Sequence, residues 1–61
     1  MSRNEKIMDW LISIAKEIRE EEGYLPFEKN ELESFIRRME KRDNLEPLTN
    51  DEVQNLMDKH S

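Results

Sequence analysis

Cysteine is absent from this sequence, glycine occurs once and proline occurs twice. A chain without cysteine can form neither a disulfide nor a Cys-ligated zinc site. The redox state of its compartment therefore does not constrain it, and we expect a cytoplasmic protein. A single glycine cannot build a glycine-rich loop around a phosphate group. These absences exclude disulfide scaffolds, zinc ribbons and nucleotide-binding loops.

Long hydrophobic runs are also absent. The longest uncharged run, residues 10–15, is far shorter than the roughly 20 residues that cross a membrane. The first residues lack the features of a signal peptide, because no clean apolar segment follows a basic start. We therefore expect no membrane partner.

Charged residues are abundant and make up 41% of the 61 residues, against 34% for hydrophobic residues, and the net charge is -5. A chain of this length forms one domain at most, and such a domain buries only about 60% of its unfolded surface. A composition this polar borders on disorder unless its apolar residues are periodic. They are periodic, so we expect one small folded domain over residues 1–61.

Helical periodicity is visible in three segments, at about 4–22, 28–42 and 50–59. Apolar residues recur every three or four positions in each segment, which is the spacing of one face of a helix. Gly23 is a natural C-cap for the first helix. The connections are short, and short connections favour antiparallel neighbours. The sequence therefore predicts an all-α three-helix unit, an antiparallel helical hairpin with a short docked third helix.

The start of the third helix has the clearest local signal. Thr49 and Glu52 have the spacing of a capping box, in which each side chain accepts a hydrogen bond from the backbone N–H of the other residue. Leu48 and Val53 have the spacing of a hydrophobic staple across the same cap. A helix of about ten residues is not stable alone in water, so this helix must dock on the other two.

The predicted core takes one apolar stripe from each helix. In the first helix the stripe consists of Ile7, Leu11, Ile14 and Ile18, at spacings of 4, 3 and 4. The other predicted members are Leu32, Phe35, Ile36, Met39, Val53, Leu56 and Met57, with Tyr24, Leu25 and Phe27 closing the first turn.

The first helix is apolar over a wider sector than this core requires. Its apolar residues span roughly 200°, whereas one packing partner covers about 100°. Met8, Trp10 and Ile12 lie outside the chosen stripe. Exposed methionine, tryptophan and isoleucine are typical of protein interfaces, so we predict an apolar partner-binding surface at these three residues.

Acidic residues are concentrated in one stretch. Residues 17–33 contain seven glutamates and two basic residues and so have a net charge of -5, equal to that of the whole chain. In a helical hairpin this stretch lies at one end, where it serves either solvation or a second, acidic partner-binding surface. The predicted members of that surface are Glu17, Glu20, Glu21, Glu22, Glu28 and Glu31.

Basic residues gather at the end of the second helix. The set consists of Arg37, Arg38, Lys41 and Arg42, and it could contact phosphate groups. However, a chain with a net negative charge lacks the basic footprint of a nucleic-acid-binding protein, and no helix-turn-helix turn accompanies the set. A nucleic-acid partner is therefore disfavoured.

No residue pattern indicates catalysis or metal binding. The serines have no glycine-rich elbow and no identifiable base. His60 is the only histidine, and it lies at the end of the last helix without the spacing of a metal ligand. We therefore expect no enzymatic activity, no catalytic residue, no metal and no cofactor.

The sequence favours a non-enzymatic protein that binds another protein, a small acidic regulator or inhibitor with a basic or nucleic-acid-binding partner. Three alternatives stay open. One is an obligate homo-oligomer that pairs its first helices, most simply as a two-fold dimer. The second is a protein whose face at 37–42 contacts phosphates, and the third is an acidic mimic of nucleic acid.

Overall fold

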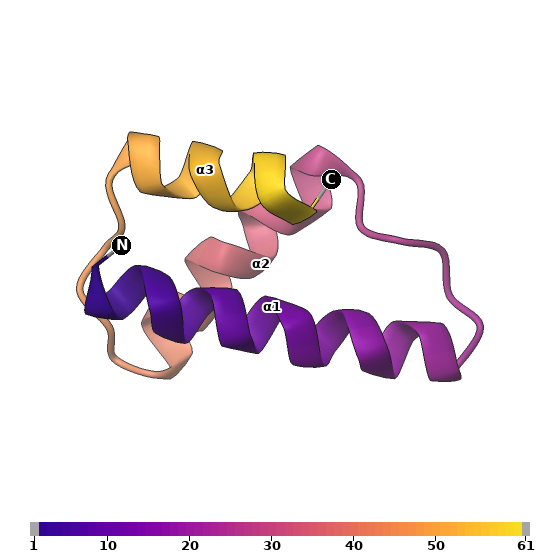
Figure 1. Cartoon of the computed structure of the whole chain (residues 1–61). Coiled ribbons are helices and arrows are strands. Elements are labelled where there is room, and N and C mark those ends of the chain that lie inside the picture. Colours follow the sequence, from indigo (N-terminus) through magenta and orange to yellow (C-terminus); the bar gives the residue numbers. More distant parts are fainter. Residues whose placement is uncertain (1, 61) are drawn as a thin grey trace.

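The computed structural model describes residues 2–60, which form three helices. These are α1 (Arg3–Glu21), α2 (Lys29–Arg42) and α3 (Asn50–His60). Their bounds lie within one residue of those that the periodicity predicts, and the all-α three-helix fold is confirmed. Figure 1 shows that α1 and α3 run in the same direction, while α2 runs back obliquely between the two ends.

Both α1 and α2 end in a Schellman motif, which needs one residue in the left-handed conformation. Gly23 has φ 79° after α1, and Asn44 has φ 55° after α2. At the end of α1 the N–H groups of Gly23 and Tyr24 donate to the carbonyls of Glu20 and Arg19. Glycine adopts this conformation freely and asparagine tolerates it. The predicted cap at Gly23 is confirmed.

The starts of α1 and α3 are capped by hydroxyl groups. Ser2 Oγ accepts the N–H of Glu5 at 3.2 Å. Thr49 Oγ1 accepts the N–H of Glu52 at 3.2 Å, and the Thr49 N–H donates to Glu52 Oε1 at 2.9 Å. The predicted capping box of the third helix is therefore confirmed.

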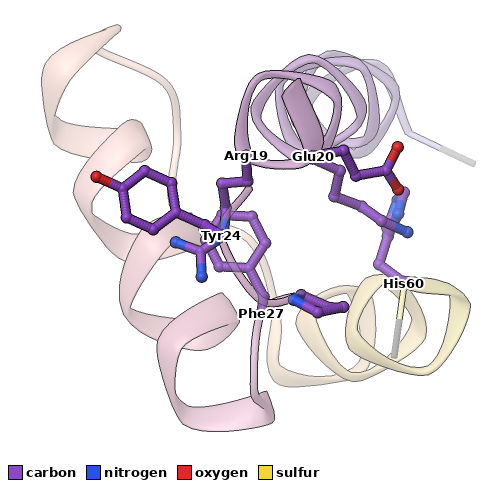
Figure 2. Close-up of a pocket in the computed structure, with 7 residues that line it drawn as sticks. Arg19, Glu20, Tyr24, Phe27 and His60 are labelled. Carbon is purple, nitrogen blue, oxygen red and sulfur yellow. The ribbon is translucent and has the colours of Figure 1, made fainter. Parts of the chain in front are cut away.

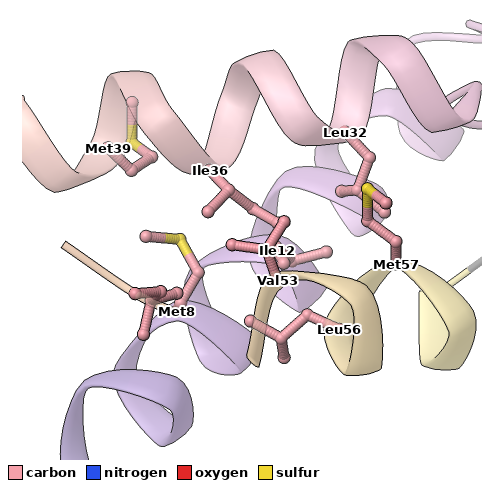
Figure 3. Packing of buried hydrophobic residues seen from close by; sticks show 9 residues of the cluster. Met8, Ile12, Leu32, Ile36, Met39, Val53, Leu56 and Met57 are labelled. Atoms are coloured by element: carbon pink, nitrogen blue, oxygen red, sulfur yellow. The ribbon is translucent and has the colours of Figure 1, made fainter. Parts of the chain in front are cut away.

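The core lies where the three helices meet, and its side chains point toward one another in Figure 3. Each fully buried aliphatic side chain stabilises the fold by about 1.5–3 kcal/mol relative to exposure. The buried hydrophobic residues are Met8, Ile12, Leu32, Ile36, Met39, Leu48, Val53, Leu56 and Met57.

The predicted stripe of α1 is wrong. Met8 and Ile12 are fully buried, whereas Ile18 is 49% exposed. The other three members of that stripe, Ile7, Leu11 and Ile14, are half-buried. The first turn also differs from the prediction, because Tyr24 and Leu25 are exposed and Phe27 alone packs against the core.

Charged residues beside the buried face of α1 form contacts with the rest of the fold. Successive helix residues are about 100° apart, so Met8, Ile12, Asp9 and Arg19 share one side of α1. Asp9 forms ion pairs with Lys59 and His60 of α3, and the Arg19 guanidinium lies 4.3 Å from the ring centroid of Phe27. Turning the predicted stripe inward would break these contacts.

A buried carboxylate fixes the approach to α3. Glu40 is 6% exposed, and its Oε2 accepts the backbone N–H of Leu48 at 2.5 Å. Arg37 Nη1 donates to the carbonyl of Leu48 at 3.1 Å and also contacts both carboxylate oxygens of Glu40. Side chains of α2 thus satisfy both backbone polar groups of buried Leu48, which would otherwise be costly to bury.

None of the helices in residues 2–60 is long and apolar enough to cross a membrane.

Candidate protein-binding surface

An apolar strip on α1 is left uncovered by the other two helices. Trp10 is 64% exposed and Ile18 is 49% exposed. We call this strip the outer face of α1, and it consists of Ile7, Trp10, Leu11, Ile14 and Ile18. Of its half-buried members, Leu11 reaches the edge of the core. Among the described residues, Trp10 and Ile18 are the exposed large hydrophobic residues that lie on a helix.

Of the three residues predicted to form an apolar partner-binding surface, one lies on the surface of the fold. Trp10 is exposed, but Met8 and Ile12 are fully buried and are unable to contact a partner. The wide apolar sector of α1 is divided between the core and the surface. Met8 and Ile12, predicted to lie on the surface, are in the core. The residues that share the surface with Trp10 are the isoleucines and the leucine assigned to the core from their spacing.

The glutamates predicted to bind a partner are all exposed, as is Glu33. The last turns of α1 contain Glu17, Glu20 and Glu21, and Glu22 is the C-cap residue after them. Figure 1 shows that the start of α2 lies nearer that end of the molecule than the end of α2 does. Glu31 also approaches Arg19 across the turn, with 3.8 Å between its Oε2 and Nη2. We call Glu17, Glu20, Glu21, Glu22, Glu28 and Glu31 the acidic end.

Arg19 organises the turn beside the acidic end. Its Nε and Nη2 donate to the Leu25 carbonyl at 3.1 and 2.6 Å, and its guanidinium lies between the rings of Tyr24 and Phe27. Figure 2 shows this cluster beside a hollow of about 240 Å³, which Glu20 and His60 also line. Arg19 therefore holds the turn through its two hydrogen bonds to the Leu25 carbonyl and its contacts with the two rings.

The basic set on α2 divides into two groups. Arg37 is held by Glu40 and by the Leu48 carbonyl, so it has a structural role. The three remaining members, Arg38, Lys41 and Arg42, are exposed. One of the four residues predicted to contact phosphates is therefore already engaged within the fold.

Two carboxyl groups between α1 and α3 have lowered pKa values. The hydrogen bond from Lys59 Nζ, at 2.7 Å, holds the pKa of Asp9 below its ordinary value of 3.8, and the contact with His60 acts in the same direction. The hydrogen bond from the Ser2 hydroxyl, followed by that from the Thr49 backbone, lowers the pKa of Glu52. Asp9 contacts α3 from α1, and Glu52 of α3 contacts the N-cap residue of α1.

His60 is engaged in the structure, since its Nε2 lies 2.5 Å from Asp9 Oδ1. Among residues 2–60, no three His, Cys, Asp or Glu side chains are grouped so that they could hold a metal ion. The position of His60 in the last turn of α3 was visible in the sequence. Its contact with Asp9 of α1, 51 positions away, could not be predicted from the residues around either one.

Comparison of the chain with protein-family models, with curated proteins and with solved structures finds no match. We therefore infer function from surface chemistry.

Proposed function

We propose that this protein is a non-enzymatic protein-binding module, a small acidic regulator or inhibitor that acts in the cytoplasm. The outer face of α1 supplies the apolar contact, and the acidic end supplies charge. The observation that carries the proposal is Trp10, which is 64% exposed beside half-buried aliphatic residues on a regular helix. Tryptophan is the residue most enriched at the energetic centres of protein interfaces.

The composition supports the same proposal. The chain contains one tryptophan, and a small domain gains most from large aromatic side chains when it buries them. Trp10 nevertheless lies on the surface while methionines fill the core. A partner that covers the outer face would bury the Trp10 side chain, which the isolated chain leaves exposed to water.

The acidic end contributes to partner choice. Glu20, Glu21 and Glu22 lie at the C-terminus of α1, where the helix dipole disfavours negative charge. Exposed charges of one sign speed the approach of an oppositely charged surface and repel others, and they affect association rate more than affinity. The partner would therefore carry basic groups beside the site that receives the outer face.

The test is capture of partners from a lysate of the cells that produce the protein, with immobilised wild type and two variants. The first variant, Trp10→Lys with Ile18→Lys, places charges on the outer face. The second, Leu25→Lys, is the matched control because Leu25 is 81% exposed and lies outside that face. We expect at least one protein, a second copy of this chain included, that binds wild type and the control but not the outer-face variant.

Circular dichroism of each variant confirms that the helices are retained. The proposal fails if no bound protein depends on Trp10 and Ile18 and the chain also shows no self-association through them. Binding that is lost equally with Leu25→Lys also counts against it, because the outer face would then have no special role.

A further inference from the structure

The outer face of α1 is bounded by opposite charges at its two ends. A single row along the helix consists of Arg3, Ile7, Trp10, Ile14, Glu17 and Glu21, at spacings of 4, 3, 4, 3 and 4. This alternation is the spacing by which one helix packs along another. Lys6 lies beside Arg3 on the basic side of the row, so the face is basic at the N-terminal end and acidic at the C-terminal end.

The charges at both ends are available for a partner. Arg3, Lys6, Glu17 and Glu21 are exposed. The ion pairs found in residues 2–60 join Arg19 to Glu31, Arg37 to Glu40, and Asp9 to Lys59 and His60, so none involves these four side chains. They therefore serve no ion pair in the isolated fold.

We infer that a second copy of this chain covers the outer face, with the two α1 helices antiparallel about a two-fold axis. The inference rests on the proposed function and names the protein that occupies the face. The spacing of the row is the same when read from either end, so in this pairing Arg3 faces Glu21 and Trp10 faces Ile14 of the second copy. The same register places Ile7 opposite Glu17, and Lys6, beside the row, approaches that carboxylate from the next position. The two-fold axis repeats every contact.

Other pairings fit the charges less well. A parallel pair would place Arg3 beside Arg3 and Glu21 beside Glu21, and like charges in contact are destabilising. A uniformly basic partner would meet Arg3 and Lys6 with the wrong sign. A complementary surface must be acidic opposite Arg3 and basic opposite Glu21. The antiparallel copy of α1 has this distribution of charge. Antiparallel helices also align their dipoles favourably.

The experiment exchanges the charges one end at a time and measures mass in solution by sedimentation equilibrium. Wild type should approach twice 7.4 kDa at micromolar concentration. One half-exchange is Arg3→Glu with Lys6→Glu, and the other is Glu17→Lys with Glu21→Lys. Each places charges where the dipole of α1 favours them, so neither should unfold the chain.

Each half-exchanged variant should dimerise at least about tenfold more weakly, because two ion pairs at each end become like-charge contacts. A mixture of the two variants, and the variant with all four changes, should regain the wild-type affinity. The control is Glu33→Lys with Glu46→Lys, two exposed glutamates off the face. It changes net charge as much as Glu17→Lys with Glu21→Lys, but it should not weaken the dimer.

Trp10 gives a second measurement, since it is the only tryptophan in the chain. Its emission should shift to shorter wavelength as the concentration of wild type rises, because dimer formation removes the indole from water. The half-exchanged variants should require about tenfold higher concentration for the same shift.

Several results would overturn the inference. A wild type that stays monomeric and still captures another protein through Trp10 and Ile18 means that a heterologous partner covers the face, and the proposed function survives. A dimer that tolerates both half-exchanges means that the copies do not pair through antiparallel α1 helices. Absence of both self-association and face-dependent capture removes the inference and the proposed function together.

Discussion

The hydroxyl of Ser2 donates a hydrogen bond to Oε2 of Glu52 at 2.5 Å, across 50 positions of sequence. The same Ser2 oxygen caps α1 by accepting the N–H of Glu5, and the other carboxylate oxygen of Glu52 accepts the N–H of Thr49. A short series of hydrogen bonds therefore joins the starts of the two helices that run in the same direction. The two caps should not act independently.

We predict that Thr49→Ala lowers the free energy of unfolding by about 1 kcal/mol, and that Ser2→Ala has an effect of similar size, through lost capping. In the double variant the losses should deviate from additivity by at least about 0.5 kcal/mol, because both caps share Glu52. Urea unfolding measures each value. Ser34→Ala, at an exposed site within α2, is the control and should cause no loss. Strictly additive losses would show that the caps are independent.

A second prediction concerns the buried carboxylate of Glu40, which accepts the N–H of Leu48. Glu40→Ala should destabilise the fold by about 2 kcal/mol, because a buried backbone donor loses a charged acceptor. Lys41→Ala, at the exposed neighbouring position, should change stability by less than about 0.5 kcal/mol. Thermal unfolding followed by circular dichroism separates the two variants. Equal melting temperatures would mean that water satisfies the Leu48 N–H when the carboxylate is removed.

The helices and their caps were predictable because their signals are local. The capping box of Thr49 and Glu52 lies within four consecutive residues, and its hydrogen bonds form as its spacing predicts. The same holds for Gly23, whose left-handed conformation follows from its lack of a side chain. Asn44, the residue after the C-cap Asp43, ends α2 in the same way, and asparagine at that position is a weaker signal than glycine.

The rotation of α1 was not predictable from periodicity. Ile7, Leu11, Ile14 and Ile18 satisfy helical spacing as well as any core stripe does, and the other face offers only Met8, Ile12 and the small Ala15. The observed face also forms contacts with other helices that no local pattern indicates, among them the ion pair between Asp9 and Lys59, 50 positions apart. Because those contacts are non-local, the spacing alone could not show that Met8 and Ile12 are buried while Trp10 is exposed.

A third prediction uses the lowered pKa of Asp9, whose main cause is the hydrogen bond from Lys59. A carboxyl group with a lower pKa in the folded state stabilises the fold above its unfolded pKa, and this contribution is lost as the pH falls through the folded value. Wild type should therefore be more stable than Asp9→Asn at pH 7. The difference should shrink as the pH falls below about 4, since the ordinary value is 3.8.

Urea unfolding of both proteins at several pH values between neutral and acidic conditions measures this difference. Asp43→Asn is the control, because Asp43 is exposed and forms no ion pair among residues 2–60. Its difference from wild type should vary less with pH. A difference for Asp9→Asn that stays constant down to strongly acidic pH would contradict the ion-pair account, because packing alone would then explain it.

A fourth prediction concerns the cost of the acidic end. Replacement of Glu20, Glu21 and Glu22 by glutamine should leave the helices intact and raise the free energy of unfolding by some tenths of a kcal/mol per residue, because it removes negative charge from the C-terminus of α1. The gain should fall at high salt, where charge interactions are screened. Replacement of Asp43 and Glu46 by their amides removes two negative charges away from this end. That control separates the dipole effect from general repulsion.

If the acidic end serves recognition, the variant with glutamine at positions 20–22 should associate with its partner more slowly than wild type does, although it is more stable. The rate constant for binding a captured partner should fall relative to wild type at low salt, and the two proteins should converge as salt rises, because steering acts through long-range charge. The amide control should keep more of the wild-type rate, since its charges lie away from the acidic end. Stopped-flow measurement with Trp10 emission as the signal gives the rates over a range of salt concentrations. Equal rates and equal salt slopes for the two proteins would assign these glutamates to solubility alone, and the outer face of α1 would then account for recognition without them.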